Sequence, residues 1–399
     1  MAENRDVLIL ITRDISNFTI KTRLPRRFPF PACVLMHGTI SDNIRKESIM
    51  QGMKKPRKLQ ADDTLAAVTL SWGGPNIFPN RYEAGKRQLE KTFDVKVVEM
   101  PHTLSDTGWL MENPEARADD LMRAFSDPTI NGIVSTIGGD DSIRILPHLD
   151  LKVIRDNPKI FLGFSDSTVT HLVCLKTGVV SYYGPSIMAG FAENGGLLHY
   201  MVDAVKRTLF SSLPVGELKP NTDGWTDEHL DWAEPAHQAR KRILNKSSGW
   251  KFIQGSGIHQ GHLVGGCFEV LDWLRGTSVW PTPDMWRGAA LFIETSEEAP
   301  SPGDVKRGLR ALAAAGVLKE INGILFGRPG GQVPVEQFGA YDEVIIQVVA
   351  NEEKLTDIPI VTCMDFGHTD PMTVLPLGVE CEIDCDTEQI FIHENAVDD

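Results

Sequence analysis

The stretch TLAAVTLSWGGP, residues 64–75, decides the fold because it joins a buried strand to a glycine-rich loop. Its first seven residues carry no charge, as expected of a strand that is covered on both faces. The same arrangement returns at residues 132–141 (GIVSTIGGDD) and 160–167 (IFLGFSDS), and helix-like segments lie at residues 80–93 and 114–126. This alternation predicts βαβ units and a mainly parallel, flavodoxin- or Rossmann-like α/β sheet, with the site at the carboxyl ends of its strands.

A second α/β pattern begins near residue 260. AALFI at residues 289–293 and GILF at 323–326 indicate strands, and SPGD at 301–304 has the cap and first-turn proline of a helix start. We therefore expect two domains joined by a linker. The predicted segments are an N-terminal α/β domain with the nucleophile (59–215), a Trp-containing linker or active-site loop (216–254), and a smaller, β-rich C-terminal α/β domain (255–399).

The first 58 residues differ from the rest in charge. Residues 1–60 hold twelve Lys and Arg against five Asp and Glu, a net +7, whereas the whole chain of 399 residues is at −14. Residues 26–36 faintly suggest an export signal, but the prolines within them make a poor one. We expect residues 1–58 to be a disordered extension, or the product of a start upstream of the true one at Met50 or Met53.

The net charge of −14 argues against nucleic acid and anionic membrane as partners. No apolar run reaches the roughly 18–20 residues that span a bilayer. Six cysteines are scattered without CxxC pairs, which indicates reduced thiols and a cytoplasmic protein. His259 and His262 lie three residues apart, which is weak evidence for a metal site without a third ligand of known spacing.

Ser165 is the candidate nucleophile. It stands in GFSDS (163–167), between the expected strand of residues 160–162 and a helix expected over 168–176. A serine on a tight strand-to-helix turn projects its hydroxyl, and the free N–H groups of the helix start can hold an oxyanion. Ser167 replaces the second glycine of the usual G-x-S-x-G elbow. The alternative is a helix cap, because Ser and Asp are favoured caps.

A serine needs a base, and the base needs an orienting carboxylate. His368 lies in a loop that neighbouring Gly and Pro make rigid, and Glu294 directly follows the strand AALFI. The glycine pair Gly138-Gly139 follows another strand and can bring backbone N–H groups close to an anion. Each feature also has a structural alternative: a packing histidine, a solvated strand end and an ordinary tight turn. The order Ser165, Glu294, His368 is one that α/β-hydrolases also show.

Taken together, seven segments resemble the LD-carboxypeptidase family of serine peptidases, and within it the branch that contains the microcin C immunity peptidase. The segments are LSWGGP (70–75), IGGDDS (137–142), GFSDST (163–168), GHLVGG (261–266), LFIETSEE (291–298), ILFG (324–327) and FGHTDPMTVLPLG (366–378). The resemblance implies a triad of Ser165 as nucleophile, His368 as base and Glu294 as orienter. It also implies a homodimer, no metal or organic cofactor, and an oxyanion hole formed by the N–H of Asp166 and one from Gly138-Gly139.

The immunity-peptidase branch is favoured by tryptophans in and after the expected linker. Six of the eight tryptophans lie between residues 225 and 286. Aromatic rings stack on nucleobases, so we expect Trp225 and Trp232 to bind substrate. The alternative is that some of the six, Trp273 in particular, belong to the core.

The resemblance implies a serine carboxypeptidase or amidase that hydrolyses an amide bond near the C-terminus of a small peptide or peptidyl-nucleotide. A murein tetrapeptide LD-carboxypeptidase is the alternative with the same chemistry. An esterase of the α/β-hydrolase type and a non-catalytic small-molecule binding protein are further alternatives. A dinucleotide-binding protein is disfavoured, because no GxGxxG follows the first strand.

Overall fold

A computed structural model describes residues 52–399 of the protein, so most of the predicted N-terminal extension lies outside the described residues. The last residues of that extension are part of the fold. Lys54 donates its backbone N–H to the carbonyl of Gly178 at 2.7 Å, and Lys58 donates to that of Asp398 at 2.8 Å. The folded chain therefore begins before the predicted boundary.

Six strands form the first sheet, in the order β12-β5-β4-β3-β1-β2. The first five strands of the chain are parallel, and β12 is antiparallel to β5. The strands are β1 (Thr64–Val68), β2 (Lys96–Glu99), β3 (Gly132–Ser135), β4 (Ile160–Gly163), β5 (Ser181–Tyr183) and β12 (Leu375–Leu377). The order β2-β1-β3-β4-β5 is that of a flavodoxin-like doubly wound sheet, which confirms the predicted fold class.

Helices cover both faces of this sheet. Alternate residues of β1 point in opposite directions, so Ala66 packs with helices α4, α5 and α6, whereas Leu65 packs with α2 and α7. Except for the edge strand β2, which is exposed at Lys96 and Val98, the strands are buried on both faces, which explains their uncharged sequences. Two short helices, α1 and α3, follow β1 and β2. The bounds are α1 (Gly74–Ile77), α2 (Pro79–Phe93), α3 (Thr107–Glu112), α4 (Pro114–Ser126), α5 (Leu151–Asp156), α6 (Thr168–Thr177) and α7 (His199–Leu209).

Eight strands form the second sheet, in the order β6-β14-β13-β8-β9-β10-β11-β7. Its centre, from β8 to β11, is parallel, and antiparallel strands flank it on both sides. The strands are β6 (Gly216–Leu218), β7 (Lys251–Gln254), β8 (Ile258–Cys267), β9 (Ala289–Glu294), β10 (Gly323–Gly327), β11 (Ile360–Met364), β13 (Glu380–Asp384) and β14 (Gln389–Ile392). The helices that follow these strands are α8 (Phe268–Leu274), α9 (Pro283–Trp286), α10 (Pro302–Ala314) and α11 (Phe338–Ile346).

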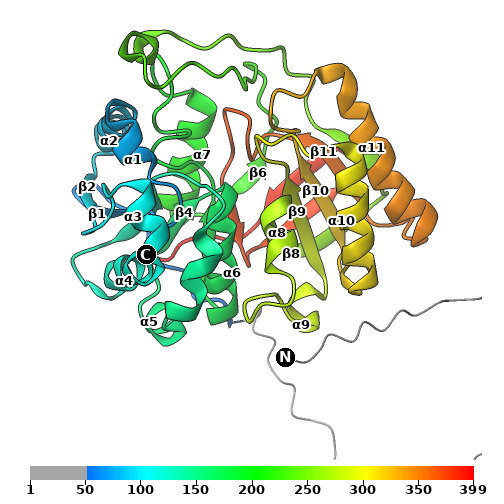
Figure 1. Ribbon diagram of the computed structural model, residues 1–399. Helices are drawn as coiled ribbons and strands as arrows, with labels where there is room; N and C mark the ends of the chain where they lie inside the picture. Colours follow the sequence, from blue (N-terminus) through cyan, green and yellow to red (C-terminus); the bar gives the residue numbers. More distant parts are fainter. Residues whose placement is uncertain (1–51) are drawn as a thin grey trace, which may run out of the picture. The chain divides into compact units, whose positions relative to one another are not determined.

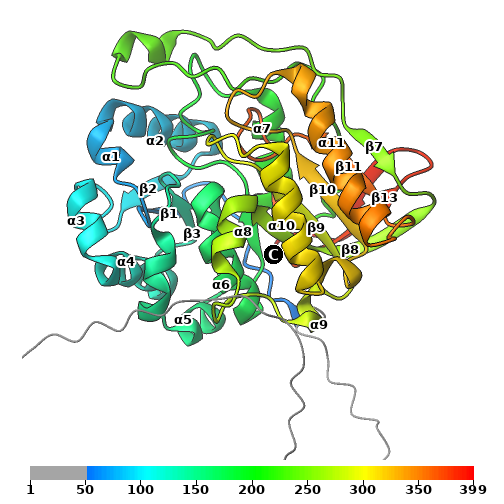
Figure 2. The same cartoon turned by 45° about the vertical axis from the view of Figure 1, so that its right-hand side comes forward.

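The two sheets exchange strands across the predicted domain boundaries. Both β6 and β7 fall inside the predicted linker of residues 216–254, yet they form the two edges of the second sheet. Conversely, β12 belongs to the predicted C-terminal domain but pairs with β5 of the first sheet. The connecting segment between β6 and β7 crosses the top of both sheets in Figures 1 and 2.

Helix α6, which follows Ser165, packs against α8 of the second sheet, and residues of both belong to one hydrophobic core. This contact places the carboxyl ends of β4 and β9 in one neighbourhood. Within residues 52–399, no helix combines the length and the apolar character needed to cross a membrane. The five cysteines in this part of the chain are free thiols.

Candidate active site

Ser165 stands on a sharp turn between β4 and α6. Its φ angle is +61°, a left-handed backbone conformation that a non-glycine residue seldom adopts. Gly163 makes the turn possible, because a Cβ there would lie 2.6 Å from the Ser167 hydroxyl oxygen. Neither Ser165 nor Ser167 caps a helix with its side chain, so the helix-cap alternative is wrong. The turn exposes the Ser165 hydroxyl instead, although the residue as a whole is 8% exposed.

Ser165, His368 and Glu294 lie in hydrogen-bonding order. The Ser165 Oγ is 3.1 Å from Nε2 of His368, and Nδ1 of His368 is 2.7 Å from Oε2 of Glu294. Glu294 is the last residue of β9 and is completely buried, while His368 lies in the loop after β11. The His368 loop packs closely against Glu294, because a Cβ at Gly367 would lie 2.5 Å from the Glu294 carboxylate. Residues more than 200 positions apart thus form one continuous chain of polar contacts.

Tyr183, the last residue of β5, adds a fourth polar group that the sequence analysis missed. Its hydroxyl donates to Oε1 of Glu294 and accepts a hydrogen bond of 3.1 Å from the backbone N–H of Ser165. The side chain is completely buried. The only signal in the sequence was its place at the end of a parallel strand, where site residues gather.

The protonation of His368 is set by two carboxylates. Burial lowers the pKa of His368, but Glu294 and Glu297 outweigh burial and raise it to about 10. Glu297 lies in the loop after β9, and its Oε2 is 3.0 Å from Nε2 of His368. The hydrogen bond to His368 lowers the pKa of Glu297 to about 2. The imidazole thus lies between two carboxylates, one at each nitrogen, and both favour its protonated form.

The Gly138-Gly139 loop follows β3 and faces the Ser165 hydroxyl. A Cβ at Gly138 would lie 2.8 Å from the Ser165 Oγ and 3.4 Å from the backbone nitrogen of Asp166, so only glycine fits. The loop therefore brings its backbone beside the Ser165 hydroxyl and beside the nitrogen of Asp166, the group with which it was predicted to form an oxyanion hole.

Buried side chains hold this loop in place. The Asp166 carboxylate accepts a 2.9 Å hydrogen bond from the backbone N–H of Ser142, and the Ser71 hydroxyl accepts one from Asp141. Arg117, which is completely buried, is 2.5 Å from the Asp141 carboxylate. Burial raises the pKa of Asp166. The loop and the Ser165 turn are thus tied together by Asp166.

A cavity of about 580 Å³ opens at Ser165. One part of its wall is aromatic: Trp232 packs edge-on against Phe78, with ring centroids 5.8 Å apart, and the Arg81 guanidinium carbon lies 4.8 Å from the Trp232 ring centre. Carboxylates line much of the rest. Its lining residues include Trp72, Phe78, Gly138, Gly139, Ser165, Trp232, Trp273, Glu297 and His368.

Of the two tryptophans predicted to bind substrate, only one lines the cavity. Trp232 lines the cavity, whereas Trp225 does not: it is 4% exposed and packs against Arg328, whose guanidinium carbon is 4.8 Å from its ring centre. The expectation that Trp225 contacts substrate is not supported, because its ring is enclosed by Arg328 and Phe338. The alternative that Trp273 belongs to the core is wrong, because Trp273 is 41% exposed and lines the cavity.

The segment that contains Trp232 is anchored beside the loop that contains His368. Arg242 pairs with Glu193 and, at 2.6 Å, with Asp370, which lies two residues after His368. The backbone of Thr226 also pairs with that of Asp370. These contacts place the connecting segment over the Ser165 cavity.

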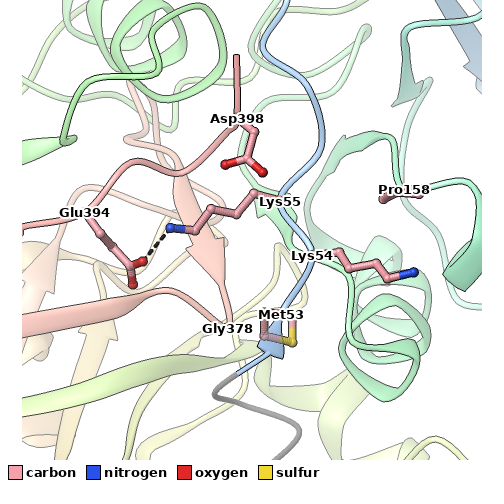
Figure 3. A pocket seen from close by; sticks show the side chains of 7 residues that line it. All are labelled: Met53, Lys54, Lys55, Pro158, Gly378, Glu394 and Asp398. Atoms are coloured by element: carbon pink, nitrogen blue, oxygen red, sulfur yellow. Dashed lines mark hydrogen bonds and ion pairs between the residues drawn. The ribbon is translucent and has the colours of Figure 1, made fainter.

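A second cavity, of about 520 Å³, lies apart from these residues (Figure 3). Its lining residues are Met53, Lys54, Lys55, Pro158, Gly378, Glu394 and Asp398. Both lysines are engaged within the fold, since Lys55 pairs with Glu394 and Lys54 donates to the Arg155 carbonyl at 2.8 Å. None of the three candidate catalytic residues lines it, so the chemistry belongs to the Ser165 cavity. Among residues 52–399, no three His, Cys, Asp or Glu side chains are grouped as a metal site would need.

Two family models match this chain. Residues 65–184 match the LD-carboxypeptidase N-terminal domain, and residues 260–383 match the LD-carboxypeptidase C-terminal domain. A Vibrio cholerae protein described as a carboxypeptidase is 30% identical over 86% of this chain and 98% of its own. The microcin C7 self-immunity protein MccF of Escherichia coli is 30% identical over 84% of this chain and 94% of its own. A Bacillus subtilis protein described as a murein peptide carboxypeptidase is 26% identical over 82% and 90%.

Solved structures of MccF and of an MccF-like protein are similar to this chain over most of its length. An MccF-like protein from Streptococcus pneumoniae, in complex with AMP, superposes with a TM-score of 0.75 at 31% identity, over 83% of this chain and 98% of its own. MccF in complex with glutamyl sulfamoyl guanosine superposes with a TM-score of 0.72 at 27% identity, over 86% and 99%. Both domain patterns, in order and over most of the chain, identify the protein: it is a serine peptidase that belongs to the LD-carboxypeptidase family.

Proposed function

We propose that the protein is a serine carboxypeptidase or amidase in which Ser165 is the nucleophile, His368 the general base and Glu294 the orienting carboxylate. The observation that carries this proposal is the unbroken contact chain from the Ser165 Oγ through both nitrogens of His368 to Glu294. A serine hydroxyl is a weak nucleophile until an adjacent base accepts its proton, and the base needs a partner that fixes its orientation.

The reaction has two halves. His368 takes the Ser165 proton as the hydroxyl attacks an amide carbonyl, and it then protonates the leaving amine. The negative oxygen of the intermediate is held by the N–H of Asp166 and one from Gly138-Gly139. Water then hydrolyses the acyl-enzyme in a second cycle, again with His368 as the base.

We propose that the substrate is a small peptide or peptidyl-nucleotide that is cut at an amide bond near its C-terminus. Two observations support a nucleotide part: the aromatic wall formed by Trp232 and Phe78, and the nucleotide ligands named for the MccF and MccF-like structures. Base stacking on such rings contributes about 1–3 kcal/mol for each base. A cytoplasmic homodimer is part of this proposal, on the strength of the family resemblance and the free cysteines.

A murein tetrapeptide is the second candidate substrate. It is favoured by the relative described as a murein peptide carboxypeptidase, and the same triad would cut its last amide bond. The aromatic wall gives it no evident partner, so the peptidyl-nucleotide is the first candidate.

The test is a substrate screen with products identified by mass spectrometry. The purified protein is incubated with a peptidyl-aspartyl nucleotide and with the murein tetrapeptide, beside the variants Ser165→Ala and Ser167→Ala. We expect one amide to be cut by the wild type and by Ser167→Ala, and turnover by Ser165→Ala to fall by at least about a thousandfold. Full activity of Ser165→Ala, or no hydrolysis of either compound by the wild type, would refute the proposal.

A further inference from the structure

Arg328 is a buried cation that the proposed reaction does not use. It is the first residue after β10, it is 2% exposed, and it lines neither the Ser165 cavity nor the adjoining one. Its Nη2 donates to Oδ1 of Asp365 at 2.8 Å, and Asp365 is completely buried. A buried ion pair adds little stability over apolar side chains of similar volume, because both charges lose their hydration. Stability alone therefore does not account for the pair.

The guanidinium of Arg328 contacts the loop that contains His368 on both sides of the histidine. Asp365 lies three residues before His368, and Thr369 directly follows it. Nη1 of Arg328 donates to the Thr369 hydroxyl at 3.3 Å, while Nη2 binds Asp365. The segment after β10 also packs against the histidine, since a Cβ at Gly330 would lie 2.7 Å from the Cβ of His368. One planar group thus fixes the loop before and after His368.

The remaining contacts of this ion pair come from the segment that connects β6 and β7. Oδ2 of Asp365 accepts hydrogen bonds from Nε1 of Trp250, at 2.7 Å, and from the backbone N–H of Asn221, at 2.9 Å. The Trp225 ring lies over the guanidinium of Arg328, whose carbon is 4.8 Å from the ring centre. The face of an aromatic ring attracts a cation placed in this way. Both carboxylate oxygens and the guanidinium face therefore have partners, which gives the pair one defined position.

We propose that Arg328 is a positioning residue for the proposed base, His368. By holding the residues on both sides of His368, it keeps Nε2 within reach of the Ser165 hydroxyl. The two residues follow strands of different sheets, β4 and β11, so the 3.1 Å between them depends on where the loop lies. A displacement of about 1 Å can lower a rate by about a hundredfold. The inference rests on the proposed function and adds a residue that touches neither substrate nor Ser165.

The test compares Arg328→Lys with Arg310→Lys. Lysine keeps the charge opposite Asp365, but its single nitrogen lacks the planar fork of donors that reaches Asp365 and Thr369 together. Arg310 is the matched control because it lies in α10 and makes a two-point contact with the Glu352 carboxylate, at 2.6 and 2.8 Å. The same substitution thus breaks a two-point contact near the proposed base in one variant and far from it in the other.

We expect Arg328→Lys to lower kcat by about 10–100-fold with KM within about threefold of the wild type. The substrate is whichever of the peptidyl-aspartyl nucleotide and the murein tetrapeptide the wild type cuts. Labelling of Ser165 by a serine-reactive phosphonate should slow by a similar factor, because that reaction also needs the base. Arg310→Lys should match the wild type in kcat, KM and labelling rate. A merely structural role of Arg328 would reduce thermal stability and the amount of folded protein, but not the rate per folded molecule.

The double variant Arg328→Met/Asp365→Asn guards against a folding defect. It removes both buried charges at once and keeps an oxygen for Trp250, so it should fold and lose at least as much kcat as Arg328→Lys. The inference is overturned if kcat of Arg328→Lys stays within about twofold of the wild type, if only KM rises, or if neither variant folds. In each of these cases turnover by the wild type leaves the proposed function standing. A wild type that cuts neither compound and is not labelled at Ser165 overturns the proposed function and this inference with it.

Discussion

The backbone N–H of Ser165 donates a hydrogen bond of 3.1 Å to the phenolic oxygen of Tyr183. Because the same hydroxyl donates to Glu294, one buried group ties the backbone of the proposed nucleophile to the proposed orienting carboxylate. The N–H of Ser165 is thereby occupied and is not available to an oxyanion, which leaves that role to Asp166 and the glycine loop. Tyr183 acts through its neighbours and is a positioning residue.

Tyr183→Phe should lower kcat by about 10–100-fold with little change in KM, because a hydrogen bond to a charged group contributes about 1.5–3 kcal/mol. Without the phenol proton, Glu294 bears more negative charge and the Glu294–His368 pair binds its proton more tightly. The acid limb of kcat/KM should therefore move to higher pH. An unchanged pH profile, with a loss of thermal stability alone, would reduce Tyr183 to a packing residue.

The pH dependence of the wild type follows from the two carboxylates on His368. Only neutral His368 can accept the Ser165 proton, and its pKa is raised to about 10. We therefore expect kcat/KM of the free enzyme to rise from neutral pH toward pH 10. Glu297→Gln removes one of the two carboxylates, so its acid limb should move to lower pH, opposite to that of Tyr183→Phe. A pH–rate profile of the three proteins checks both signs, and a flat wild-type profile between pH 7 and pH 10 would contradict the raised pKa of His368.

The substitution Gly138→Ala tests whether the glycine loop has to lie close to the Ser165 hydroxyl. The Cβ of Gly138→Ala would lie 2.8 Å from the Ser165 Oγ, so the hydroxyl or the loop must shift. A displacement of this kind costs about a hundredfold in kcat. Gly339→Ala is the matched control, since a Cβ there meets nothing within 4 Å in helix α11. Equal activity of both variants would show that the loop does not contact the reacting groups.

Substitution of Trp232 should weaken substrate binding, whereas substitution of Trp225 should lower stability. Trp232→Ala removes a cavity wall and should raise KM for a nucleotide substrate by roughly 5–100-fold, with a small change in unfolding free energy. Trp225→Ala empties a buried site and should lower the free energy of unfolding by about 3–5 kcal/mol. Steady-state kinetics and denaturant titration of both variants test this contrast. The opposite pattern would return Trp225 to the substrate site.

The strands and the triad candidates could be predicted because their signals are local. Uncharged runs such as residues 64–70 identify buried strands, and Ser165, Glu294 and His368 each lie at the end of such a run or a few residues after it. Parallel strands end at one edge, which brings these residues into reach of one another.

Other features depend on packing that no local pattern records. The sequence around Tyr183 does not distinguish it from other strand residues. Strand β12 has only three residues, all buried, and its sequence does not indicate which sheet it joins. Trp225 and Trp232 lie in one segment with no periodicity, so only the tertiary contacts of Arg328 and Arg81 tell them apart. Trp273 belongs to an amphipathic helix, but it lies on the face of that helix that borders the cavity.

The central claim is that Ser165 carries the acyl group during turnover. The most direct measurement is peptide-resolved mass spectrometry of the protein after reaction with a serine-reactive phosphonate, beside Ser165→Ala and Ser167→Ala. We predict one adduct, on the peptide that contains Ser165, in the wild type and in Ser167→Ala, and none in Ser165→Ala. An adduct on another residue, or unlabelled Ser165 in a protein that hydrolyses its substrate, would contradict the claim.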